Sequence, residues 1–101
     1  MLRIYDVALK ALEAMRPAVA AIERRDRDLA RQMRRAASSV VLNIAEGSGS
    51  SGGTRGERYR NALGSAREVV ACIDVARAWG YANMDSGALR EVIGTLVNVT
   101  R

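Results

Sequence analysis

Apolar residues recur along this chain at helical spacing, in four blocks separated by charged or glycine-containing segments. In the first block, a series of apolar side chains from Ile4 to Ile22 is spaced alternately four and three residues apart. This spacing places the series on one face of an amphipathic helix. Pro17 lies inside the block, so we expect a kink or a local break there.

The second block lies between two segments of different composition. Before it, the charged segment 23–28 lacks apolar spacing, and we expect a turn there with Asp26 as the N-cap of the next helix. After it, the glycine- and serine-rich segment 47–53 predicts a flexible connection with glycines available for a left-handed cap. The apolar stripe from Leu29 to Ile44 predicts a helix between these segments.

The third block carries its own start and stop signals. Thr54 and Glu57 have the spacing of a capping box, in which each side chain accepts a hydrogen bond from the other residue's backbone. Trp79 and Gly80 are expected to close this helix. Asp85 is then well placed to cap a fourth helix.

Together the blocks predict helices over approximately residues 2–23, 27–46, 55–80 and 86–100. No alternation of apolar and polar residues lasts long enough to favour a strand. Four helices with short connections favour an all-α fold, an antiparallel up-down four-helix bundle in a single domain over residues 1–101. The repeated three-four spacing predicts shallow, left-handed packing at crossing angles of about +20°.

Composition adds two expectations to this fold. The apolar content comes mainly from small aliphatic side chains, with no Phe and one Trp in 101 residues, so we expect part of the apolar surface to be buried between subunits of a homo-oligomer. The net charge is +5, and fifteen of the sixteen basic residues are arginine. Arginine suits phosphate and carboxylate, which permits RNA, DNA or an acidic protein as partner, although genome composition can also explain the arginine-to-lysine ratio.

The same sequence argues against several other classes of protein. The single cysteine, Cys72, cannot form an internal disulfide, the N-terminus is a poor signal peptide, and no apolar run is long enough for a membrane span. We therefore expect a cytoplasmic protein. There is no histidine for an imidazole base or a metal ligand, and the glycine-rich segment lacks the lysine of a phosphate-binding loop. We expect no enzymatic activity, no metal, no cofactor and no small-molecule substrate.

Arginines gather around the first predicted turn. Four of them, Arg24, Arg27, Arg31 and Arg34, recur at three-four-three spacing and are predicted to share one helical face directed away from the core. The full candidate nucleic-acid surface consists of Arg24, Arg25, Arg27, Arg31, Arg34 and Arg35. An ordinary solvated face with intrahelical ion pairs is the alternative. No aromatic residue interleaves with these arginines, so contacts to the phosphate backbone are favoured over base stacking.

A polar interruption follows in the same helix. Asn43 continues the apolar stripe, so its amide is expected at or beside the core, where it must find hydrogen-bond partners. Ser39 lies one turn before it and Glu46 one turn after it, and Ser65, Glu68 and Arg35 are candidate partners. We interpret Ser39, Asn43, Glu46, Ser65 and Glu68 as a structural polar network that sets helix register, in preference to a ligand site.

These residues carry a family resemblance. The stretches QMRRAASSVVLNIAEGSG and YRNALGSAREVVACIDVARAWGY resemble the 23S rRNA intervening-sequence proteins over residues 29–81. The matching positions are Gln32, Arg34, Arg35, Ala36, Ala37, Ser39, Asn43, Ile44, Ala45, Glu46, Gly47, Gly64, Ser65, Ala66, Glu68, Gly80 and Tyr81. The chain departs from the family pattern in the turn at 22–28, at Leu42 in place of proline and at Tyr59 in place of phenylalanine.

The resemblance implies an up-down four-helix bundle that is commonly a homopentamer. Some relatives are encoded inside ribosomal RNA insertions, and others resemble the accessory variability determinant of diversity-generating retroelements, which works with a reverse transcriptase and its RNA. The leading hypothesis is therefore a non-enzymatic homo-oligomer that binds nucleic acid, with RNA favoured, through arginine-rich surfaces. The alternative is an adaptor or scaffold subunit that docks an acidic partner, such as a reverse transcriptase, without direct RNA binding.

Overall fold

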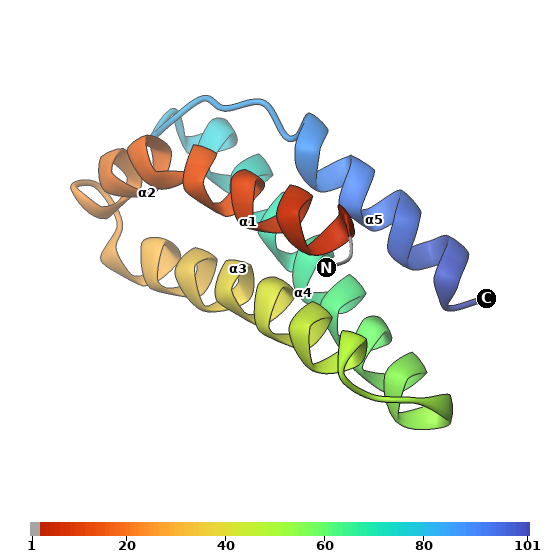
Figure 1. Cartoon of the computed structure of the whole chain (residues 1–101). Helices are drawn as coiled ribbons and strands as arrows, with labels where there is room; N and C mark the ends of the chain where they lie inside the picture. The colour runs from red at the N-terminus through yellow and green to blue at the C-terminus, as the bar shows by residue number, and fades with distance from the viewer. Residues whose placement is uncertain (1–2) are drawn as a thin grey trace.

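The computed structural model describes residues 3–101 as five helical segments joined by short connections (Figure 1). These segments are α1 (Arg3–Ala14), α2 (Arg16–Glu23), α3 (Arg27–Ser48), α4 (Gly52–Trp79) and α5 (Gly87–Val99). α1 and α2 are the two halves of one helix of the bundle, interrupted at Met15. Residues 3–101 contain no strand, and the predicted all-α four-helix bundle is confirmed.

The interruption between α1 and α2 is the predicted break at Pro17. Proline has no backbone N–H to give the carbonyl of Glu13, so the regular hydrogen-bond ladder fails at this point. The N–H of Met15 instead bonds the Leu12 carbonyl at 3.1 Å, and the Met15 carbonyl accepts from Val19 at 2.9 Å. Met15 keeps helical backbone angles, φ −79° and ψ −14°. The break is therefore local, and Pro17 occupies the first turn of α2, where proline is tolerated.

The core is built around the pair formed by α3 and α4, which pack along most of their length (Figure 1). Small residues face this interface, and Ala30 on α3 and Ala62 and Ala66 on α4 are fully buried. The predicted stripe from Leu29 to Ile44 is buried as expected. The largest fully buried side chains are Ile22, Met33, Ile44, Ile73, Leu96, Val69 and Val92, which come from four of the five helical segments.

Figure 1 shows the chain turning back at each of the three connections between bundle helices. One end of the bundle holds the α2–α3 turn and the end of α4, since Arg25 lies over the ring of Tyr81. The other end holds the α3–α4 connection with the start of α1 and the end of α5, because Arg3, Gly52 and Val99 line one hollow. The left-handed sense of packing stays a prediction.

The glycine-rich connection is much shorter than the sequence predicts. α3 continues through Gly47 and Ser48, and α4 begins at Gly52, so only residues 49–51 join the two helices. Gly47 is buried under Tyr59, and a Cβ atom at position 47 would lie 2.5 Å from the Tyr59 Cε1 atom. The expectation of a flexible segment over 47–53 is wrong, because glycine serves close packing at its first position.

The predicted caps of this connection are also wrong. The N-cap of α4 is Ser51, so Thr54 lies inside the helix and forms no capping box with Glu57. Gly49, the C-cap of α3, has a φ of −88° and is not left-handed. The side chain of Arg55 instead holds the connection, since its Nε atom donates to the carbonyls of Ser50 at 2.9 Å and Gly47 at 3.3 Å. The Ser50 hydroxyl also donates to the Glu46 carbonyl at 2.8 Å, so the end of α3 is satisfied both locally and by a side chain of the following helix.

The remaining helix ends follow the sequence closely. The Asp26 carboxylate accepts from the N–H of Leu29 at 3.0 Å, which confirms the predicted N-cap of α3. Gly80 ends α4 with a left-handed φ of +76°, and the N–H of Tyr81 bonds back to Ala76 at 2.8 Å. At α5 the cap is one residue later than predicted: Ser86 holds the N-cap position, while the Asp85 carboxylate accepts from the N–H of Gly87 at 3.2 Å.

Candidate nucleic-acid interface

The six candidate arginines lie in and just after the α2–α3 turn, and all are exposed. Arg24 and Arg25 stand in the turn itself, because α2 ends at Glu23 and Asp26 has an extended backbone with φ −157° and ψ 94°. The predicted single helical face from Arg24 to Arg34 is therefore wrong, since Arg24 lies in the turn and the other three arginines lie on α3.

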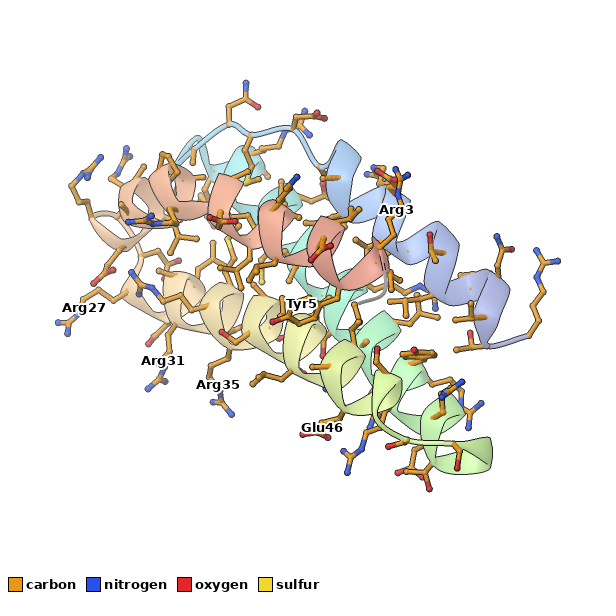
Figure 2. All side chains as sticks on the ribbon, viewed as in Figure 1. Arg3, Tyr5, Arg27, Arg31, Arg35 and Glu46 are labelled. Carbon is orange, nitrogen blue, oxygen red and sulfur yellow. The ribbon has the colours of Figure 1, made fainter. Side chains whose placement is uncertain are left out.

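Along α3 the exposed row consists of Arg27, Arg31 and Arg35, which are four residues apart. Figure 2 shows these three side chains pointing outward along α3, away from the body of the bundle. Within residues 3–101, Arg27 and Arg35 form no ion pair. Arg31 lies 4.0 Å from Asp28, with both side chains more than two thirds exposed, and such a pair contributes little. The row therefore presents three guanidinium groups to solvent.

Arg34 has a different role from its neighbours in the row. Its guanidinium hydrogen-bonds the carboxylate of Glu23 and forms an ion pair that joins α3 to the end of α2. This hydrogen bond and the arginine charge lower the pKa of the Glu23 carboxyl below its usual value. The pair is about half exposed on both sides, so we interpret Arg34 as a helix-joining residue that borders the candidate surface.

The turn and the start of α3 form an open hollow with an excess of positive charge. It is lined by Glu23, Arg24, Arg25, Asp26, Arg27, Asp28, Arg31 and Arg34. Two of the three carboxylates are already engaged, Glu23 with Arg34 and Asp26 with the backbone of α3. Arg34 is likewise engaged with Glu23, but the five arginines outnumber the three carboxylates, so a phosphate group would find several donors within one concavity.

Aromatic side chains also reach this end of the bundle, which the sequence interpretation missed. The guanidinium carbon of Arg25 lies 5.5 Å from the centroid of the Tyr81 ring, within the range of a cation–π contact. Trp79 stacks on Tyr81 with ring centroids 6.3 Å apart. The signal was available in the topology, because an up-down course returns the end of α4 to the level of the α2–α3 turn.

The polar network predicted in the interior exists in a smaller form. The Asn43 amide donates to the Ser39 carbonyl at 2.9 Å and to the Ser39 hydroxyl at 3.0 Å. The Ser65 hydroxyl donates to the Ser39 hydroxyl at 2.7 Å, which links α4 to α3. All three residues are half-buried, and the described residues hold no fully buried side-chain polar atom without a partner.

Glu46 and Glu68 are not part of this network. Both are exposed, because they lie on the outer sides of their helices, beyond the half-buried stripe that carries Asn43 and Ser65. Glu46, labelled in Figure 2, pairs with Arg58 of α4, with 3.1 Å between Oε2 and Nε. Glu68 acts instead on Cys72. Burial raises the pKa of the Cys72 thiol, and the negative charge of Glu68 raises it further.

Two further observations concern metal ligands and membrane spans. Residues 3–101 contain no group of three or more His, Cys, Asp or Glu side chains able to hold a metal ion. Over the same range, none of the helices combines the length and the apolar character that crossing a membrane requires.

The fold and the site together define this chain as a helical bundle protein with an arginine-rich surface at one end. Within that class, the family model of the 23S rRNA-intervening sequence proteins matches residues 2–98. The chain belongs to this family, as its sequence resemblance indicated. Neither the curated proteins nor the solved structures contain a match to this chain.

Proposed function

We propose that this protein is a non-enzymatic, homo-oligomeric helical bundle of the cytoplasm that binds RNA through the arginines of its α2–α3 end. The observation that carries the proposal is the concentration of five arginines around one hollow, with Arg35 extending the row along α3. Guanidinium groups contact phosphate oxygens as paired donors, and such contacts drive binding through the release of counterions.

The choice of RNA rests on two further considerations. The family is named for an intervening sequence of 23S rRNA, which favours RNA among the polyanions that this surface could contact. The arginines that line the basic hollow come from both the turn and the start of α3, so they suit the successive phosphates of a backbone better than a single small anion.

We also propose that several copies of the chain assemble, with five as the number that the family resemblance implies. Large apolar side chains remain at the surface of one copy, and among them Leu9, Leu42 and Val75 are between 37% and 61% exposed. Closed symmetry would repeat the arginine end once per subunit and increase the overall avidity for a long RNA.

The binding proposal is tested with the triple variant Arg27→Glu, Arg31→Glu, Arg35→Glu and a labelled RNA. All three side chains are exposed, so the fold should persist, as circular dichroism would check. We expect the unaltered protein to lose affinity steeply as salt is raised, and the variant to bind at least about a hundredfold more weakly at low salt.

The matched control replaces Arg60, Arg67 and Arg101 with Glu. These three residues are exposed and lie outside the α2–α3 end. The control changes the net charge equally, so its affinity should fall much less if the proposed surface makes the contacts. Equal losses in the two variants would contradict the assignment of the surface. Absence of RNA binding by the unaltered protein, with capture of an acidic protein partner instead, would favour the adaptor alternative.

The assembly is tested separately by light scattering on the full chain. We expect a mass that is a multiple of 10.9 kDa, with five copies as the predicted number. A mass of one chain at micromolar concentration would contradict the oligomer.

A further inference from the structure

Trp79 is the most exposed of the large apolar side chains, with 68% of its surface accessible. It is the last residue of α4, and its ring stacks on Tyr81 with a centroid distance of 6.3 Å and an angle of 16° between the ring planes. A stack at this centroid distance is strongly offset, so much of the indole surface stays open to solvent. An exposed tryptophan of this kind adds little to the stability of a single chain.

The backbone around the stack holds these rings in place. Gly80 adopts a left-handed conformation, φ +76°, which turns the chain sharply after Trp79. The N–H of Tyr81 bonds to the Ala76 carbonyl at 2.8 Å, so Tyr81 is folded back against the end of α4. Tyr81 is half-buried, whereas Trp79 is not. The two rings therefore form a supported aromatic surface whose outer member is Trp79.

The aromatic pair is continuous with the arginine end of the bundle. Arg25, which lines the basic hollow, places its guanidinium 5.5 Å from the centroid of the Tyr81 ring. If a nucleic-acid strand placed its phosphates in the hollow, the neighbouring bases of that strand would lie within reach of the Trp79 indole. A double helix could not use this surface in the same way, because its bases are stacked on one another and only end pairs are open.

We propose that Trp79, supported by Tyr81 and Arg25, is a stacking platform for an unpaired base of a single-stranded RNA. The inference rests on the proposed RNA binding and deepens it, since it names single-stranded RNA as the form that is preferred. Base–aromatic stacking tolerates any base, so the platform selects unpaired strands without selecting a sequence. The arginines supply the phosphate contacts, and Trp79 supplies the preference for unpaired bases.

The test uses the fluorescence of the protein itself, because Trp79 is the only tryptophan of the chain. A short uridine homopolymer is titrated into the full-length protein, and a duplex RNA of equal length and an abasic phosphodiester strand are titrated in parallel. Stacking of a base on the indole quenches its emission, so we expect quenching by the uridine strand alone. The abasic strand carries the phosphates without the bases and should bind through the arginines with unchanged emission.

Variants at position 79 complete the test. Trp79→Ala should weaken binding of the uridine strand on the order of tenfold and leave the abasic strand unaffected, while Trp79→Phe should restore most of the loss. Val99→Ala removes another exposed apolar side chain, far along the bundle, and should change neither affinity.

The outcomes separate this inference from the proposed function. Binding of the uridine strand without quenching, or with equal affinity after Trp79→Ala, would overturn the platform and leave the arginine surface standing. A lower assembly mass for Trp79→Ala would also overturn it, since Trp79 would then be a subunit contact. Failure of all three strands to bind the unaltered protein would overturn both the platform and the proposed function.

Discussion

The two connections that flank α3 differ in composition and in what holds them. The α2–α3 turn is charged, contains neither glycine nor proline, and is fixed by the Asp26 cap on the backbone of Leu29. The α3–α4 connection is rich in glycine and serine, yet α3 extends into it as far as Ser48. It is held by local bonds from Ser50 to the carbonyls of Glu46 and Gly47 and, in addition, by the side chain of Arg55. The charged turn is thus specified by a cap within its own sequence, while the glycine-rich connection also needs a side chain from the following helix.

The same contrast separates the candidate surface from the opposite end of the bundle. At the α2–α3 end the short turn and the start of α3 expose arginines around one hollow. Near the α3–α4 connection, Arg58 is paired with Glu46 and Arg55 is bonded to backbone carbonyls. Arg24 and Arg27 near the first turn are exposed and form no ion pair within residues 3–101, so they are available to a partner, whereas Arg55 and Arg58 near the second connection are engaged in the fold.

The largest change in stability is expected on substitution of Gly47. A Cβ atom there would approach the Tyr59 ring to 2.5 Å, so Gly47→Ala must displace the ring or separate α3 from α4. We expect a loss of about 1–3 kcal/mol in the free energy of unfolding, measured by urea denaturation.

Gly49→Ala is the matched control for that substitution. A Cβ atom at position 49 would meet its nearest neighbour at 3.8 Å, and the backbone there has a negative φ of −88°. Its stability should change by less than about 1 kcal/mol, in the stabilising direction. Equal effects of the two substitutions would mean that Gly47 provides flexibility rather than close packing.

A smaller effect is expected at Asp26, which caps α3. Asp26→Ala should lower the stability by about 1 kcal/mol, because the N–H of Leu29 loses its acceptor. Asp26→Asn keeps a good cap and removes one negative charge from the basic hollow. This variant should keep its stability and bind RNA more tightly at low salt. A weaker affinity for Asp26→Asn would contradict the electrostatic account of the hollow.

The smallest effect on RNA binding is expected at Asn43, in the interior network. Asn43→Leu removes two hydrogen bonds to Ser39. The free energy of unfolding should fall by about 1 kcal/mol, or the mass of the assembly should change. Because Asn43 lies outside the candidate surface, RNA affinity measured on the same preparation should stay within about twofold. A large loss of affinity at unchanged stability would show that the network, and not the turn, contacts RNA.

Features with a local cause could be predicted from the sequence. Asp26 begins α3 through its own side chain, Pro17 breaks the first helix because it lacks an N–H, and Gly80 ends α4 through its left-handed backbone. The buried face of α3 follows from its helical spacing in the same way. Each of these signals acts within a few residues of the position that carries it.

Features that depend on distant residues could not be predicted in that way. The helical state of Gly47 depends on the ring of Tyr59, and the capping-box pattern of Thr54 and Glu57 was overridden when α4 began earlier. The contact of Arg25 with Tyr81 joins residues that are far apart in the sequence. The arginines of the candidate surface were named from their clustering in the sequence, although their spacing predicted the wrong row, whereas their aromatic neighbours needed the fold.

The central claim is that RNA binds at the α2–α3 end, and hydrogen–deuterium exchange with and without RNA tests it most directly. Peptides that cover residues 24–31 should exchange more slowly when RNA is bound, since phosphates would cover the turn and the start of α3. Peptides that cover residues 49–51 serve as the internal reference and should exchange equally in both states. Protection of the α3–α4 connection, with none at the α2–α3 turn, would contradict the account.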